Sequence, residues 1–232
     1  PRYFRHSEQV TAPVVAIDGP SASGKGTVAA RVAAALGFHY LDSGSLYRLT
    51  ALMALRGKVL LDDEPQLASM AASLPAEFIG DRIELGGDDV TEAIRDEAVS
   101  AAASKVAALP LVRSALMERQ RAYCRLPGLV ADGRDMGSVV FPGAAAKVFL
   151  TASAEARAQR RYKQLIEKGM PANMRTLLQD LQERDARDAA RAVAPLRQEA
   201  DAHLVDTTAM GIGEAVAAVL DLVRRRLPQL AP

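Results

Sequence analysis

The stretch VVAIDGPSASGKGT, residues 14–27, decides the fold of this chain. It begins with an apolar, largely β-branched run that is typical of a buried strand, and Gly19-Pro20 then requires a turn. From Gly24 to Leu36 the chain is rich in alanine, with apolar residues at helical spacing, and Gly37 is typical of a helix end. A strand, a glycine-rich turn and a helix follow one another directly, so the sequence predicts an α/β fold.

The glycine-rich turn matches a phosphate-binding loop, the P-loop, as far as its lysine. Glycines let backbone N–H groups converge on phosphate oxygens, the helix N-terminus adds positive partial charge, and the lysine reaches the outer phosphates. Gly26 stands where Ser or Thr usually follows the lysine, but a hydroxyl from Thr27 or Ser23 can still place Mg²⁺ or its waters. We prefer this interpretation to an ordinary βα turn. The predicted loop residues are Gly19, Pro20, Ser21, Ala22, Ser23, Gly24, Lys25, Gly26 and Thr27.

Further strands and helices alternate along the chain, which predicts a parallel sheet covered on both faces. Short alternating pieces at 77–79, 82–85 and 89–90, separated by glycines, interrupt this order and predict a small inserted antiparallel meander. The other predicted strands are 38–41, 129–131, 147–150 and 202–205. The predicted helices before residue 130 are 45–56, 61–75, 92–109 with a break near 95, and 111–124. Two arginine-rich helices are predicted after residue 154, and a final helix at 212–227.

Composition excludes several classes of protein. The 232 residues are 49% hydrophobic and 25% charged, which is ordinary for a globular chain. Since 29 basic residues less 28 acidic ones give a net charge of +1, and Trp is absent, we expect no nucleic-acid partner. The one cysteine cannot form an internal disulfide, and the three histidines are far apart, so a reducing cytoplasm fits and zinc does not.

No targeting or membrane segment is expected. The sequence contains no run of about 18 apolar residues that could cross a membrane. Residues 1–12 lack the apolar core of a signal peptide and are interpreted as a flexible extension. These features predict a cytoplasmic protein without a membrane partner.

Two polar segments follow predicted strands, and the carboxyl ends of parallel strands meet at the ligand-binding edge of such a sheet. The first is DSGSLYR, residues 42–48, which offers a hydroxyl and a guanidinium to an anion. The second is DGRD, residues 132–135, where an acid can hold Mg²⁺ or its waters and an arginine can neutralise transferred charge. A capped helix start and a structural turn with a local ion pair are the respective alternatives.

A third segment, residues 183–191, is rich in arginine. If it is helical throughout, Arg184, Asp188 and Arg191 share one face. A second cluster precedes it at Arg157, Arg160 and Arg161. The alternative is a solvated, ion-paired face, but phosphoryl transfer needs mobile cations that enclose the transferring group and exclude water.

Together these segments resemble the cytidylate kinase family of nucleoside monophosphate kinases, from about Val14 to the final helix. The distinctive stretches are IDGP leading into KGT, LDSG with YR, ADGRDMG, and RDARDAARAVAPL. The resemblance implies a three-layer α/β/α P-loop kinase core with a five-stranded parallel sheet, an inserted monophosphate-binding region with small antiparallel β-structure and a helix, and a helical lid. We assign the core to 13–65, 110–156 and 191–232, the insertion to 66–109, and the lid to 157–190.

The resemblance also implies the reaction and the residues that perform it. The γ-phosphoryl group of MgATP would pass to CMP or dCMP, giving ADP and CDP or dCDP, in a monomer. Lys25, Arg134, Asp135 and Arg184 would be catalytic, Arg157 would stack on adenine beside the P-loop, and Mg²⁺ would arrive with ATP near Thr27 and Asp132. The CMP site would comprise Ser43, Tyr47, Arg48, Ser104, Arg113, Arg134, Asp135, Arg184, Asp188 and Arg191.

Other classes of P-loop protein remain as alternatives. A small kinase for shikimate or another monophosphate would share the loop but should lack the insertion and the Ser104/Arg113 pair. A GTPase switch would carry an Asn-Lys-x-Asp guanine reader, and this sequence contains none. A nucleotide-sensing module would bind without turnover, and a structural protein with an inactive loop would not need the lysine and the arginine clusters.

Overall fold

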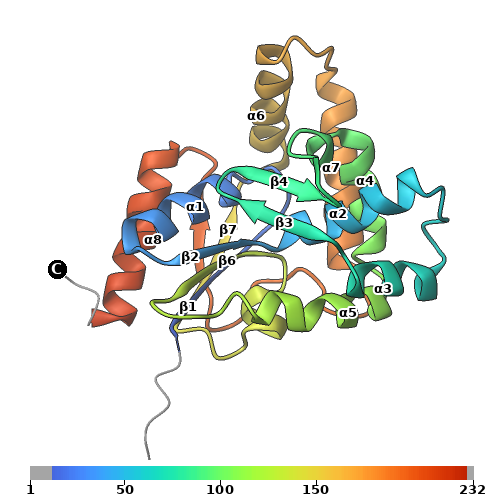
Figure 1. Ribbon diagram of the computed structural model, residues 1–232. Coiled ribbons are helices and arrows are strands. Elements are labelled where there is room, and N and C mark those ends of the chain that lie inside the picture. Colours follow the sequence, from blue (N-terminus) through green and yellow to red (C-terminus); the bar gives the residue numbers. More distant parts are fainter. Residues whose placement is uncertain (1–11, 229–232) are drawn as a thin grey trace, which may run out of the picture.

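The molecule is built on a five-stranded sheet, as a computed structural model describing residues 12–228 shows (Figure 1). All neighbouring strands run parallel, in the order β2-β6-β1-β7-β8. This confirms the predicted sheet, whereas the predicted extension lies outside the described residues except for residue 12. The strands are β1 (Val14–Asp18), β2 (His39–Asp42), β6 (Leu129–Gly133), β7 (Ala146–Thr151) and β8 (His203–Asp206).

The two faces of the sheet are covered by different helices, because successive side chains of a strand point to opposite sides. Val14 and Ala16 pack with the cluster that includes side chains of α2, α3, α4 and α5. Val15 and Ile17 pack with side chains of α1 and α8. These two helices lie side by side (Figure 1). The predicted three-layer core is thereby confirmed. These helices are α1 (Lys25–Leu36), α2 (Ser43–Arg56), α3 (Glu64–Ala72), α4 (Glu97–Val106), α5 (Pro110–Arg121) and α8 (Ile212–Arg226).

Local capping explains where several helices start. The Asp42 side chain accepts the N–H of Ser45, so α2 begins two residues earlier than predicted. Asp63 caps α3 in the same way, so that helix begins at Glu64, and it ends at Ala72, which makes it shorter than the predicted 61–75. The predicted break near residue 95 is confirmed, because a short 3₁₀ turn, η1 (Ala93–Arg95), precedes α4.

The predicted meander is also confirmed. Strands β3 (Ala76–Ile79), β4 (Arg82–Leu85) and β5 (Asp88–Asp89) form a three-stranded antiparallel sheet. Gly80, Gly86 and Gly87 supply its turns with positive φ values, which glycine adopts without strain.

Two helices project from the body of the molecule. Helix α6 (Ala154–Glu167) and the first part of α7 (Met174–Ala189) lie together at the top of Figure 1. A small apolar cluster of Ala158, Leu165, Leu177 and Leu181 joins them, separately from the clusters on the sheet.

Helix α7 is shorter than the sequence suggested. It ends at Ala189, so Arg191 lies beyond the helix, and the expectation that Arg184, Asp188 and Arg191 share one helical face is wrong for Arg191. The chain folds back after Ala189, and Leu196 donates its N–H to the carbonyl of Asp188 at 2.9 Å. In a continued helix that carbonyl would accept the N–H of Ala192, so the contact with Leu196 replaces the next helical bond.

A π-helical turn after β6 had no counterpart among the predicted elements. This turn, η2 (Met136–Val140), follows the DGRD segment directly. Among residues 12–228, no single helix is long and apolar enough to cross a membrane, although the sharply bent pair α4 and α5 together passes a test of length and composition alone.

Candidate active site

The P-loop runs from the end of β1 to the start of α1, where packing dictates its glycines. A Cβ on Gly19 would lie 2.0 Å from the carbonyl oxygen of Leu150 on β7, so no side chain fits there. Gly24 caps α1 with a φ of 87°. Lys25 is buried, donates to the carbonyl of Pro20 at 3.3 Å, and lies 3.8 Å from Asp132 Oδ1. The structure thus brings the predicted lysine and the predicted strand-end acid together.

The electrostatics of this pair suit a site for phosphate and its counterion. Burial lowers the pKa of Lys25, and the nearby Arg134 adds to this effect. Burial raises the pKa of Asp132, although the Lys25 charge opposes the shift. Asp132 Oδ1 and Ser21 Oγ are buried without a hydrogen-bond partner. Unpartnered buried polar atoms are rare, so these two indicate places for a ligand.

Asp132 also explains why Gly26 follows the lysine. A Cβ at position 26 would lie 3.2 Å from Asp132 Oδ2 and 3.7 Å from the Tyr40 hydroxyl. The Tyr40 hydroxyl in turn lies 3.4 Å from Asp132 Oδ2, and burial raises the pKa of that phenol. A side chain at position 26 would therefore crowd Asp132, which would have to shift slightly. Sequence analysis did not single out Tyr40.

The segment 42–48 serves both as a helix start and as a wall of the site. Asp42 caps α2, as the structural alternative required, and Arg48 Nη1 lies 3.9 Å from it. Ser43 donates to the carbonyl of Asp132 at 2.7 Å, which joins this segment to the end of β6. The Tyr47 ring is buried, and the Arg113 guanidinium carbon lies 5.7 Å from its centre.

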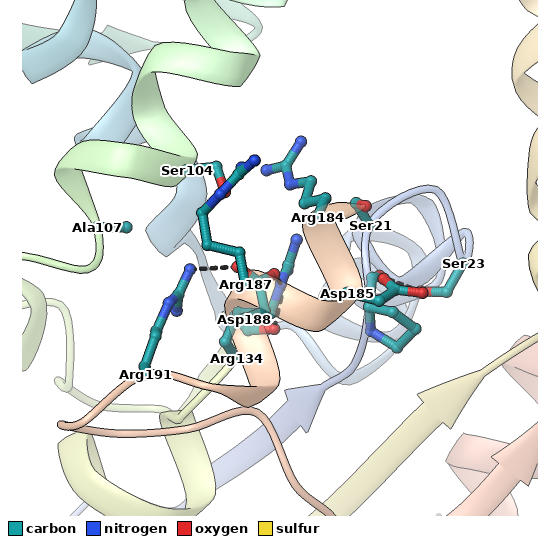
Figure 2. A network of polar contacts seen from close by, with 12 residues as sticks. Ser21, Ser23, Ser104, Ala107, Arg134, Arg184, Asp185, Arg187, Asp188 and Arg191 are labelled. Atoms are coloured by element: carbon teal, nitrogen blue, oxygen red, sulfur yellow. Dashed lines mark hydrogen bonds and ion pairs between the residues drawn. The ribbon is translucent and has the colours of Figure 1, made fainter. Parts of the chain in front are cut away.

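Asp188 links three segments of the site. Its carboxylate accepts from Arg134 Nε at 2.9 Å and from Arg191 Nη2 at 2.5 Å (Figure 2). Burial would raise the pKa of this fully buried carboxyl, but Arg134, Arg191 and Arg184 outweigh burial and hold it below its usual range. Arg191 therefore reaches the site although it lies outside α7.

Two arginines of α7 reach two serines of α4. Arg184 donates to Ser100 Oγ at 2.8 Å. Arg187 donates to Ser104 Oγ at 2.9 Å, and Figure 2 shows these two side chains close together. Burial, with the positive charge of Arg134, lowers the pKa of Arg184. Sequence analysis missed Ser100 and Arg187 as site residues. The sequence feature that could have indicated them is spacing. Arg187 lies three residues after Arg184, and Ser104 lies four residues after Ser100, so the two members of each pair share a helix face.

The remaining predicted residues fall into two groups. Arg113 and Asp135 form a buried ion pair, and Arg113 also donates to the carbonyl of Ala107 at 2.9 Å. The Nε atoms of Arg184 and Arg191 are buried without a partner, which leaves donors for a ligand. Thr27 is exposed near the start of α1.

The second arginine cluster divides between two tasks. Arg157 donates to the carbonyl of Ser21 at 3.1 Å and pairs with Asp185, a residue that sequence analysis did not assign. Arg160 donates to the carbonyl of Ser23 at 3.3 Å. These two arginines hold carbonyls of the P-loop, whereas Arg161 pairs with Glu97 at the start of α4. In the part of the chain that the structure describes, no group of three or more His, Cys, Asp or Glu could hold a metal ion.

The fold and site define a class of protein. A buried P-loop lysine at the carboxyl edge of a parallel sheet, faced by a cluster of arginines, is the machinery of a P-loop phosphotransferase. A family model described as cytidylate kinase matches residues 15–225. The chain belongs to the cytidylate kinase family.

Two cytidylate kinases agree with this assignment. The cytidylate kinase of Chromobacterium violaceum is 63% identical over 212 residues, which covers 91% of this chain and 96% of that protein. The cytidylate kinase of Bordetella bronchiseptica is 59% identical over 213 residues, with coverage of 92% and 96%. Among solved structures, a gluconokinase from Sinorhizobium meliloti is 18% identical, with a TM-score of 0.48 and coverage of 95% and 96%.

Proposed function

We propose that this chain is a cytidylate kinase that transfers the γ-phosphoryl group of ATP to CMP or dCMP, giving ADP and CDP or dCDP. The observation that carries the proposal is the meeting of the P-loop lysine with the arginines of two other segments, in a chain of this family. The acceptor phosphate is already anionic near neutral pH, so no general base is needed. Catalysis then consists of alignment and charge neutralisation by Lys25, Arg134 and Arg184.

The donor nucleotide would bind as MgATP along residues 19–27. Thr27 and Asp132 would hold Mg²⁺ or its waters, and the unpartnered Asp132 Oδ1 supports this assignment. When bound with ATP, the ion would neutralise phosphate charge. Stacking of Arg157 on adenine stays a prediction, since its guanidinium pairs with Asp185 and the P-loop carbonyl of Ser21.

The acceptor would lie between α2, α4, α5 and the end of α7. Its phosphate would meet Ser43, Tyr47, Arg48 and Arg134, and Asp135 would lie nearby. Its base would meet Ser104, Arg113 and Arg191, and its sugar would meet Arg184 and Asp188. The free Nε donors of Arg184 and Arg191 support this placement. A site that accepts hydrogen bonds from the cytosine amine leaves buried groups unpaired with uracil, which gives strong discrimination.

Domain closure completes the proposal. The insertion at 66–109 and the lid at 157–190 would close over both nucleotides, because uncovered ATP would lose phosphate to water. We expect a cytoplasmic monomer. Another small P-loop kinase is the competing function, but the meander and the Ser104/Arg113 pair favour a cytidylate acceptor.

The test is ADP production in a coupled assay. The wild-type chain receives MgATP with CMP, dCMP, UMP, AMP, GMP or shikimate, and a reaction without acceptor serves as the control. We expect rapid ADP release with CMP and dCMP and much slower release with the others. Folded protein that binds ATP but gives no CMP-dependent ADP would rule out the proposed reaction.

A further inference from the structure

Asp18, the last residue of β1, makes two hydrogen bonds to a distant loop. Its side chain is buried, with 8% exposed. Oδ1 accepts the N–H of Met136 at 2.8 Å, and Oδ2 accepts the N–H of Gly137 at 2.8 Å. Both carboxylate oxygens are thus used on consecutive backbone amides, 118 and 119 residues further along the chain.

These two amides open the π-helical turn η2, and N–H groups at the start of a helical turn have no partner within it. The residue that precedes such a turn ordinarily caps it. Here Asp135 precedes η2 but makes no side-chain cap, because its carboxylate pairs with Arg113. Asp18 supplies the cap from a neighbouring strand, which leaves Asp135 for Arg113.

The same contacts join the two loops of the site. Asp18 directly precedes Gly19, the first residue of the P-loop, while Met136 directly follows Asp135. A third hydrogen bond, from Gly19 N to the carbonyl of Gly133 at 3.3 Å, lies alongside. The P-loop and the loop carrying Arg134 are therefore tied together by three bonds at one point.

We propose that Asp18 is a positioning residue that sets the placement of the loop carrying Arg134 and Asp135 relative to the P-loop. The inference rests on the proposed function, in which one loop binds the donor phosphates and the other binds the acceptor phosphate. In-line transfer depends on the alignment of the two, and a displacement of about 1 Å can lower the rate about 100-fold.

Burial disfavours the charged form of the Asp18 carboxyl, and this free-energy cost supports a role for Asp18 beyond filling space. Burial raises the pKa of Asp18 to about 7, although the Met136 and Gly137 N–H bonds oppose the shift. Asp135 and Asp132, the acidic groups facing Asp18, raise its pKa further. A neutral side chain would fill the position without this penalty, but it would not offer two acceptors to two adjacent amides.

The test is Asp18→Asn, which keeps the shape but turns one oxygen into a donor that faces a backbone N–H. We expect kcat with CMP to fall about 10- to 100-fold, while KM for ATP changes less than threefold, because the P-loop keeps its own contacts. The matched control is Asp63→Asn at the start of α3, where Asn caps a helix as well as Asp does. Its kcat should stay within twofold of wild type.

A purely structural role predicts a different result. Asp18→Asn would then lower the melting temperature while kcat stayed within twofold of wild type, and this outcome overturns the inference. If the Asn variant does not fold, Asp18→Ser, whose hydroxyl accepts one N–H, takes its place with the same expected fall in kcat.

A measurement on the unmodified chain completes the test. The amides of Met136 and Gly137 should exchange slowly with solvent, and exchange as fast as in an open loop contradicts the contacts themselves. A wild-type chain without CMP-dependent ADP removes the proposed function and the inference together. An active wild type with an unimpaired Asp18→Asn variant removes the inference alone.

Discussion

Lys25 is the residue on which the proposed chemistry depends most directly. It lies in the P-loop between the carbonyl of Pro20 and the carboxylate of Asp132, and its burial removes water that would screen its charge. A charge held in place before the reaction costs no reorganisation when the phosphoryl group moves. The lysine is therefore the natural target for a first substitution.

We predict that Lys25→Ala lowers kcat about 100- to 1,000-fold, or about 3–4 kcal/mol of transition-state stabilisation. Steady-state ADP release with CMP measures the effect, and thermal unfolding shows whether the variant is folded. Lys163→Ala, at an exposed lysine on α6, is the control and should retain its turnover. Near-normal turnover of Lys25→Ala would overturn the P-loop assignment.

Asp18 also makes a prediction about stability and pH. Its pKa is about 7 in the folded chain and about 3.9 when unfolded, so between these values the folded state holds the extra proton. Stability contributed by this group is therefore lost as pH rises from about 4 to 7. Between pH 5 and 8, wild type should lose about 2–3 kcal/mol relative to Asp18→Asn, measured by urea unfolding. A stability difference that does not change with pH would contradict the raised pKa.

At the scale of elements, the end of β6 is the most crowded junction of the site. A Cβ on Gly133 would lie 2.6 Å from Ser43 Oγ and 2.8 Å from the Met136 side chain. Ser43 holds the carbonyl of Asp132, so a displaced serine would release the strand that carries the site's acid. The close approach of β6, α2 and η2 therefore depends on glycine, which has no side chain, at position 133.

We predict that Gly133→Ala destabilises the chain by about 1–3 kcal/mol, because the neighbours must shift to admit a methyl group. Urea unfolding measures the change. Gly143→Ala is the matched control, since a Cβ there meets nothing within 4 Å, and its stability should stay within about 1 kcal/mol of wild type. Equal stabilities for the two variants would show that the junction relaxes freely.

At the scale of the whole molecule, four contacts join residues 154–189, which carry α6 and α7, to residues 92–106, which carry η1 and α4. Arg184 and Arg187 reach Ser100 and Ser104, and two ion pairs lie alongside. These are Arg161 with Glu97 and Lys168 with Glu92. The proposed lid and the proposed insertion are thus held together across the site by polar contacts, of which the two partly exposed ion pairs contribute little to stability.

We predict that Glu97→Gln changes the free energy of unfolding by less than about 1 kcal/mol, because the pair is partly exposed. KM for CMP should rise about two- to fivefold, since the closed form is less populated. Glu167→Gln, which removes a pair within α6, is the control and should leave KM unchanged. An unchanged KM in Glu97→Gln would show that this contact does not contribute to closure.

The sequence by itself determined the sheet, its covering helices, the meander and the P-loop. These features depend on local patterns, such as alternation along a strand, helical spacing from Gly24 to Leu36 and glycines at required turns. Such patterns are set by backbone geometry and by which face is buried, so they are legible within a few residues. The family resemblance rested on motifs at three of these strand ends and on the arginine-rich stretch from Arg184 to Leu196.

Only the tertiary structure decided how the charged side chains pair. Arg191 lies beyond α7 yet meets Asp188, and Asp18 caps a turn that begins 118 residues later. Arg157 and Arg160 hold the P-loop, whereas Arg161 turns to α4. Charges act through space, and long side chains choose among several partners. The pairing therefore depends on which segments the fold brings together. A local pattern such as the spacing of Ser100 and Ser104 shows which side chains share a helix face, but not which partner they meet.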